Sequence, residues 1–142
     1  FTVYGPWGRP DMALFKFTKA LFENKKIELF NNGKHLRDFT NIKDVCNIIV
    51  RLVQKKPKQK IPYEVYNLGG GQPKELLYFL KLIEKYTAKK AKVKKLGIQP
   101  GDIYMTNSCK KKLISRIKYK HSVSLEVGIN EFVEWYKSYY LN

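Results

Sequence analysis

The sequence predicts an α/β fold in a single domain. Segments with the pattern of strands and segments with the pattern of helices alternate along the 142 residues, as in α/β proteins. Apolar residues make up 44% of the chain, which is enough for a core. No internal repeat of roughly 20–50 residues divides the sequence. We therefore treat residues 1–142 as one domain.

The first half alternates short strands with two helices. β-prone residues open the chain at 1–4. The spacing of apolar residues predicts a helix of about a dozen residues that Asp11 caps. A strand over 27–30 ends at an Asn-Gly turn signal, and extended chain returns over 36–42. Thr40 or Asn41 caps the second helix. Its expected apolar stripe consists of Val45, Ile48, Ile49, Leu52 and Val53.

The second half follows the same logic. A strand over 63–68 ends at three consecutive glycines, and Pro73 suits the first position of the next helix. Residues 91–96 alternate lysines with other residues, which is typical of a half-exposed strand. A short helix is expected over 109–117. The last helix is capped by Ser122 or Ser124 and carries an aromatic-rich stripe.

The net charge of +16 raises nucleic acid as a partner, but the composition favours a solvated surface. Lysines account for 24 of the 28 basic residues and are spread along the chain, whereas specific base readout favours arginine. No run of about eighteen apolar residues is present. We therefore expect neither a nucleic-acid partner nor a membrane partner.

Cysteine and histidine give no sign of a metal centre. Cys46 lies in an apolar helical stretch and is expected to be buried, whereas Cys109 lies beside three lysines. His35 and His121 are isolated in the sequence and are expected to be exposed. None of these residues has the spacing of a metal site or of a disulfide framework. A reducing, cytoplasmic location is the default for such a chain.

Five segments carry a resemblance to a known family, and they occur in that family's order. They are FTVYGPWGRPDM at 1–12, IELFNNGKHLRDFTNIKDV at 27–45, YEVYNLGGGQPKEL at 63–76, IQPGDIYMT at 98–106 and INEFVEWYKSYY at 129–140. The chain resembles the UDP-glucuronate 4-epimerases within the extended short-chain dehydrogenases/reductases over essentially its whole length.

This resemblance implies the C-terminal, substrate-binding lobe of an NAD-dependent epimerase. Such enzymes oxidise C4 of the sugar of UDP-glucuronate and return the hydride to the other face, giving UDP-galacturonate. The family's Gly-rich NAD fingerprint and its catalytic Ser/Thr, Tyr and Lys lie before the position of Phe1. We therefore expect no catalytic residue here, NAD bound mainly by a Rossmann part outside this sequence, and no activity of this chain alone. A homodimer is expected only of the full-length protein.

The resemblance assigns the substrate contacts residue by residue. Arg37 would bind the diphosphate, for which the planar guanidinium is well matched; the alternative is a surface pair with Asp38 or Asp44. Thr2 and Arg9 would hold the uronate carboxylate; the alternatives are an ordinary strand residue and a pair with Asp11.

Further contacts are implied around the ribose, the base and the cofactor. Gln99 and Asp102 belong to a loop that would cover the ribose and diphosphate, or would form a plain polar turn. Ile27 and Phe30 would flank the uracil, with core packing nearly as good an explanation. Phe1 is the one residue expected beside NAD. Core packing is the better explanation for Met12 and Phe15, although both could line the same pocket.

Two motifs imitate catalytic signatures. Tyr86 and Lys90 have Tyr-x-x-x-Lys spacing, but they end a lysine-rich helix with no Gly-rich unit before it. Gly69 to Gly71 follow a strand but lack the later residues of either phosphate-binding fingerprint, so we interpret them as a hinge. Two alternatives to the epimerase remain: a dehydratase or decarboxylase acting on another nucleotide sugar, and a non-catalytic basic module for UDP or nucleic acid.

Overall fold

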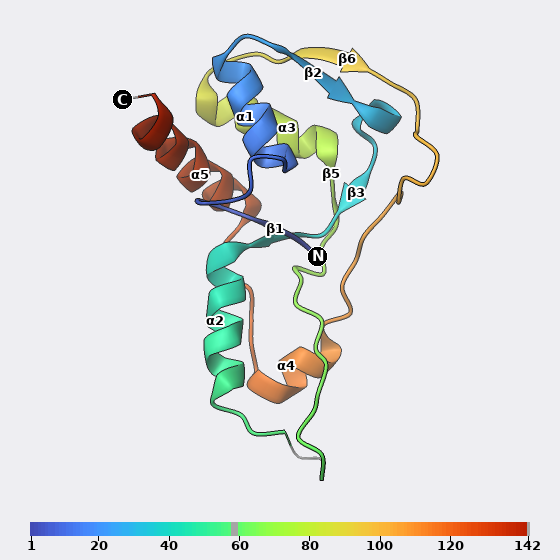
Figure 1. The fold of residues 1–142 in the computed structure, drawn as a ribbon, viewed down its shortest axis with the longest axis vertical. Coiled ribbons are helices and arrows are strands. Elements are labelled where there is room, and N and C mark those ends of the chain that lie inside the picture. The colour runs from blue at the N-terminus through green and yellow to red at the C-terminus, as the bar shows by residue number, and fades with distance from the viewer. Residues whose placement is uncertain (58–59, 142) are drawn as a thin grey trace.

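The structure is a computed structural model that describes residues 1–57 and 60–141, and the predicted α/β class is confirmed. Helices and short strands alternate along the chain (Figure 1). In order they are β1 (Thr2–Tyr4), α1 (Ala13–Phe22), β2 (Lys26–Leu29), the 3-10 helix η1 (Phe30–Gly33), β3 (Leu36–Arg37), β4 (Phe39–Asn41), α2 (Ile42–Val53), β5 (Lys74–Glu75), α3 (Leu76–Thr87), β6 (Lys92–Lys95), α4 (Lys111–Ile117) and α5 (Leu125–Tyr140).

The strands pair in three two-stranded ladders rather than in one sheet. β1 runs parallel to β4, with Thr2 opposite Phe39, and β2 runs parallel to β6. β3 and β5 are antiparallel and place Arg37 opposite Lys74. These ladders join segments that are distant in sequence, so they bring the N-terminal strand beside the motif around Arg37.

Two hydrophobic clusters lie at opposite ends of the molecule. The larger is built by α1, α3 and α5 around buried residues that include Leu29, Phe79 and Phe132. The smaller lies between α2 and α4 around Ile48 and Leu113. Figure 1 shows β1 and β4 crossing between these two ends. Residues of β1 and β4 therefore lie where both halves of the fold meet.

Several predicted elements differ from the structure. No strand forms over 63–68, because none of the described strands runs beside that segment to pair with it. Residues 74–75 form β5 instead of opening the third helix, since β3 supplies a pairing partner. The α2 stripe is also only partly buried: Ile48 is inaccessible, whereas Val53 is 81% exposed. Cys46 is exposed, not buried, because α2 packs on one side only.

Two of the three helices with a predicted N-cap have one of the predicted cap residues, and the third does not. The Asn41 side chain accepts from the Lys43 amide at 2.9 Å and so caps α2, and Ser124 caps α5 by accepting from Val127 at 3.3 Å. Asp11 does not cap α1, which begins after Met12, because its carboxylate is paired with Arg9. Within residues 1–57 and 60–141, no helix combines the length and the apolar character that crossing a bilayer requires.

α5 packs closely on β1 and β4 at Gly128. A Cβ there would lie 2.4 Å from Asn41 Nδ2 and 2.5 Å from the Tyr4 hydroxyl, and both side chains are buried. Gly128→Ala is therefore expected to lower the free energy of unfolding by about 1–3 kcal/mol through overpacking. Gly97→Ala is the matched control, since nothing lies within 4 Å of its Cβ position. Urea unfolding that gave both variants the same stability would contradict this packing.

Candidate functional site

Arg37 has a guanidinium that is held in place without a negative partner. Its Nη1 donates to the carbonyls of Leu36 at 3.0 Å and Tyr104 at 3.2 Å. Across the described ranges, no carboxylate lies within ion-pairing distance of Arg37. The two carboxylates weighed as its partners, Asp38 and Asp44, bind other groups. The side chain is thus oriented by the backbone while its positive charge stays uncompensated.

Asp38, the next residue, joins three segments of the chain. Its carboxylate is fully buried and accepts from the amides of Gly71 at 2.9 Å and Ser108 at 2.8 Å. Its carbonyl accepts from the Thr2 amide at 3.2 Å. This network fixes the strand that carries Arg37 relative to β1.

The glycines at 69–71 serve that network. A Cβ on Gly69 would lie 2.3 Å from Ser108 Oγ, so only glycine fits there. The Gly70 amide donates to Thr40 Oγ1 at 3.2 Å, and the Gly71 amide donates to Asp38. With these amides already used, the loop is not a phosphate cradle.

Gln99 to Asp102 form a tight turn beside the arginine. The Asp102 amide donates to the Gln99 carbonyl at 3.1 Å, and Gly101 has a φ of +83°. Proline second and a positive φ third are the signature of a type II turn. The chain after the turn runs along β3: the Leu36 amide donates to Tyr104 at 2.9 Å. The structure therefore brings the turn and Arg37 onto one surface.

Thr2 and Arg9 line the same small cavity, of about 30 Å³, together with Met12 and Phe15. Arg9 is exposed and makes two hydrogen bonds to Asp11, one of them from Nε at 3.0 Å. The side-chain hydrogen bond from Arg9 lowers the pKa of the Asp11 carboxyl. Exposed ion pairs are weak, so a ligand carboxylate can replace Asp11 as the partner of Arg9.

Ile27 and Phe30 occupy different surroundings. Ile27 is buried in the larger core, whereas Phe30 is half-buried at the start of η1. The amide of Asn31 donates to the Gly97 carbonyl at 3.1 Å, which ties η1 to the segment before the turn at Gln99. Phe1 lies next to Thr2 and is about half exposed. Phe30 is therefore the neighbour of the residue that ties η1 to this segment, whereas Ile27 is enclosed in the core.

Sequence reasoning gave Trp7 no structural role. Trp7 has a φ of +63°, unusual for a bulky residue, and occupies the third position of a turn closed by the Gly8 amide and the Gly5 carbonyl at 3.2 Å. Although 72% exposed, its ring contacts Trp135 and Tyr139 with centroids 5.2 and 5.0 Å away. Pro6 before Trp7 indicates a turn in which Trp7 has a positive φ. Nothing in the sequence predicts the contact of the Trp7 ring with α5.

Both histidines were wrongly expected to be isolated and exposed. His35 is buried, with Nε2 3.8 Å from Asp102 Oδ2. His121 is partly buried and lies between Asp44 Oδ2, 3.1 Å from Nδ1, and the Gly69 carbonyl, 2.8 Å from Nε2. Their partners lie far along the chain, so sequence spacing could not reveal them.

Asp44 is the most heavily hydrogen-bonded carboxylate of the described chain. Its side chain is 1% exposed and accepts from the Tyr119 hydroxyl, the Ser122 amide at 3.1 Å and the Ser122 hydroxyl at 2.8 Å, beside its contact with His121. Burial acts to raise the pKa of Asp44, but the hydrogen bonds from Tyr119, His121 and Ser122 outweigh it and lower this pKa to about 2. Asp44 therefore remains an anion at neutral pH.

The motif that imitates a catalytic pair does not form one. Tyr86 packs against the larger core, α3 ends at Thr87, and the exposed Lys90 ammonium lies 3.6 Å from Glu84. In the part of the chain that the structure describes, no three His, Cys, Asp or Glu side chains gather as metal ligands would.

Residues 1–69 match the model of the NAD dependent epimerase/dehydratase family. Over nearly its whole length the chain is similar to UDP-glucuronate 4-epimerases. It is 41% identical to a probable UDP-glucuronate 4-epimerase from Rhizobium meliloti, over 99% of this chain and 46% of the relative. Protein CapI from Staphylococcus aureus is also 41% identical, with the same coverage. The chain thus spans about half the length of the curated relatives it matches.

A solved structure agrees with these relatives. The UDP-glucuronic acid 4-epimerase from Bacillus cereus, in complex with UDP-glucuronic acid and NAD, is 34% identical and superposes with a TM-score of 0.88. The match covers 99% of this chain and 44% of that one. The expected lobe of an extended short-chain dehydrogenase/reductase is therefore confirmed as the fold.

Proposed function

We propose that this chain supplies the nucleotide-sugar-binding lobe of a cytoplasmic, NAD-dependent UDP-glucuronate 4-epimerase that makes UDP-galacturonate, a sugar donor for polysaccharides. The observation that carries the proposal is the uncompensated guanidinium of Arg37 beside the turn at Gln99–Asp102. A diphosphate supplies the two negative groups that such a planar cation binds best. The names of the relatives support the choice of UDP-glucuronate.

The roles of the remaining residues follow from their places. Asp102, at the end of the turn, accepts hydrogen bonds from the ribose hydroxyls, and Gln99 covers the diphosphate. Phe30 forms the apolar wall for the uracil, whereas the buried Ile27 contributes through core packing. Thr2 and Arg9, which line one cavity, bind the uronate carboxylate through a hydroxyl and a cation.

NAD supplies hydride uptake and return at C4 in the family's reaction. The residues described here do not fit its pyrophosphate, because the amides of Gly70 and Gly71 are already bonded to Thr40 and Asp38. Only Phe1 is proposed to lie beside the cofactor. We therefore derive no hydride step from this chain, and the homodimer proposed for the full-length enzyme involves surfaces beyond it.

A comparison of two ligands separates this function from a general basic module. UDP at about one hundred times its dissociation constant is expected to stabilise the chain by about 2.7 kcal/mol, seen as a raised Tm. Random duplex DNA at moderate salt is expected to leave the Tm unchanged, since non-specific binding through lysines is lost as salt rises. Stabilisation by DNA without stabilisation by UDP would reject the proposal.

The uronate contacts are tested by Arg9→Ala. This variant is expected to weaken UDP-glucuronate binding about tenfold or more, the size of a charge-assisted hydrogen bond, and to leave UDP binding unchanged. Isothermal titration calorimetry with both ligands measures the two changes in affinity. Asp11→Ala, which removes only the intramolecular partner of Arg9, is the control and should retain UDP-glucuronate binding. An equal loss of affinity for UDP and for UDP-glucuronate would show that Arg9 does not bind the carboxylate.

A further inference from the structure

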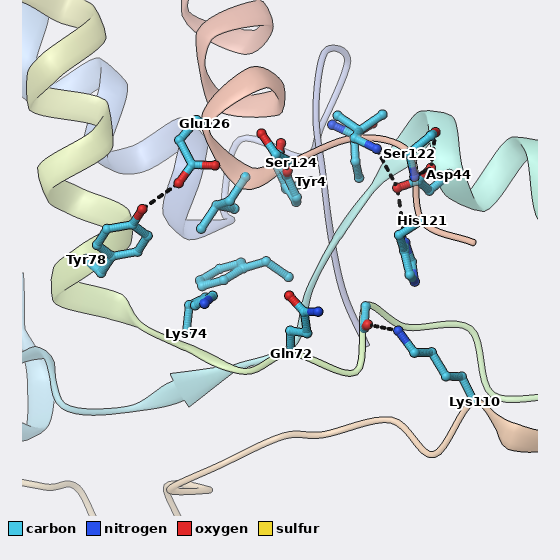
Figure 2. A pocket seen from close by; sticks show the side chains of 15 residues that line it. Tyr4, Asp44, Gln72, Lys74, Tyr78, Lys110, His121, Ser122, Ser124 and Glu126 are labelled. Carbon is cyan, nitrogen blue, oxygen red and sulfur yellow. Dashed lines mark hydrogen bonds and ion pairs between the residues drawn. The ribbon is translucent and has the colours of Figure 1, made fainter.

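A second cavity, of about 400 Å³, opens between the first turn of α5, the segment that leads into α3, and the loop before α5 (Figure 2). Tyr4 and Phe39 separate it from the small cavity at Thr2 and Arg9, since they line both. None of the residues proposed to bind the nucleotide sugar lines the larger cavity. Its volume lies within the range of roughly 300–1,000 Å³ that small-molecule sites occupy.

The inner surface of this cavity is aromatic. Phe39 and Tyr4 line it, and the Phe39 ring is held flat against the buried Phe79 with centroids 4.1 Å apart and planes 5° from parallel. Burial raises the pKa of Tyr4 to about 12, so this phenol stays neutral. A rigid aromatic face of this kind suits the apolar C–H face of a sugar ring.

Polar groups of both kinds surround that aromatic surface. The Tyr78 hydroxyl donates to Glu126 at one end, and this hydrogen bond lowers the pKa of the Glu126 carboxyl (Figure 2). The amide of Gln72 lies between the two ends and offers both a donor and an acceptor. Sugar hydroxyls donate and accept at once, so a mixed set of partners fits them better than it fits a simple ion.

The cavity carries both carboxylates and ammonium groups. Glu126 is bound to Tyr78, and the nearby Lys74 also lowers its pKa. Asp44 also lines the cavity, but its carboxylate is already occupied by Tyr119, His121 and Ser122. The Lys110 ammonium is bound to the Gly70 carbonyl at the other end. Lys74 is exposed, and no carboxylate of the described residues lies within ion-pairing distance of it. Lys74 is therefore the cation available to a ligand.

We propose that this cavity binds a monosaccharide acid of the hexuronate type, separately from the nucleotide-sugar site. The ring stacks on Phe39, the carboxylate meets Lys74, and Gln72, Tyr78 and Glu126 share the hydroxyls. The binding does not require the proposed epimerase function, because it uses a different set of side chains.

The test is a titration of the chain with glucuronate and with galacturonate, each in the presence of saturating UDP. Glucose and inorganic phosphate are the neutral and the anionic comparisons. Both uronates are expected to bind at least about tenfold tighter than glucose or phosphate. Lys74→Met should remove this preference by weakening uronate binding about tenfold. Lys81→Met, an exposed lysine of α3 outside the cavity, is the matched control and should change nothing.

Three outcomes would overturn the proposal. Phosphate binding as tightly as the uronates would make the cavity a simple anion site. Displacement of the uronates by UDP, or loss of UDP binding in Lys74→Met, would make the cavity part of the nucleotide site, because Lys74 lies opposite Arg37 in the β3–β5 ladder. Tyr78→Phe supplies an independent check. It keeps the ring, so unchanged uronate binding in this variant would remove the hydroxyl contact from the site.

Discussion

Arg37→Ala is expected to weaken UDP binding about ten- to a hundredfold. The guanidinium is fixed by the carbonyls of Leu36 and Tyr104 and lacks an acidic partner among the described residues, so its full charge is available to a diphosphate. Charge-assisted hydrogen bonds of this kind contribute about 1.5–3 kcal/mol. Isothermal titration of UDP into both proteins measures the difference.

Two variants make this result specific. Arg51→Ala removes an exposed arginine on α2 whose guanidinium lies over the Tyr119 ring, and it should bind UDP normally. Arg37→Lys keeps the charge but loses the planar fork, so its affinity should fall between the other two. If Arg37→Ala bound UDP as tightly as the unchanged chain, the diphosphate would have to bind elsewhere.

Asp44→Ala is expected to lower the free energy of unfolding by about 3–5 kcal/mol. The substitution leaves the Tyr119 hydroxyl, His121 and the Ser122 amide without their buried acceptor, and groups left in this way carry a large desolvation cost. Urea unfolding measures the loss. Asp11→Ala, which removes an exposed carboxylate, is the control and should change stability little.

Asp44 also predicts a dependence of stability on pH. Its pKa is about 2 in the folded chain and about 4 when unfolded, so the unfolded state binds the proton more readily. The stabilisation is therefore complete above about pH 4 and is lost as the pH falls toward 2. Asp44→Asn should flatten this part of the profile. A profile between pH 2 and 5 that is the same in both proteins would contradict the assignment.

The sequence predicted well those parts of the fold that depend on local pattern. The α/β class follows from residue type and spacing, and so does one of the two cap candidates offered for each of α2 and α5, Asn41 and Ser124. Residues Gln99 to Asp102 form the polar turn that was one of the two interpretations of this loop. The segment 63–68 has strand composition but forms no strand, because a strand needs a neighbour and composition does not supply one. Pro73 suggested a helix start, yet pairing with β3 turned the next two residues into a strand.

The site residues could be predicted only as far as their motifs reach. Arg37 and the residues of the Gly-Pro loop each belong to an uninterrupted sequence motif, so the resemblance identified them. The partners of His35 and His121 lie on other segments, and Asp44 became prominent only when folding brought residues 119–122 against it. The cavity at Phe39 and Lys74 has no sequence signature, since its lining comes from β1, β4, β5, three helices and the loops between them.

The most direct test of the proposed function is to titrate the 142-residue chain with UDP, UDP-glucose and UDP-glucuronate under the same conditions. All three should bind through Arg37, and UDP-glucuronate should bind about tenfold or more tightly than UDP-glucose, because only its carboxylate meets Thr2 and Arg9. Equal affinity for UDP-glucose and UDP-glucuronate, or no binding of any of the three, would contradict the assignment of this chain as a UDP-uronate-binding lobe.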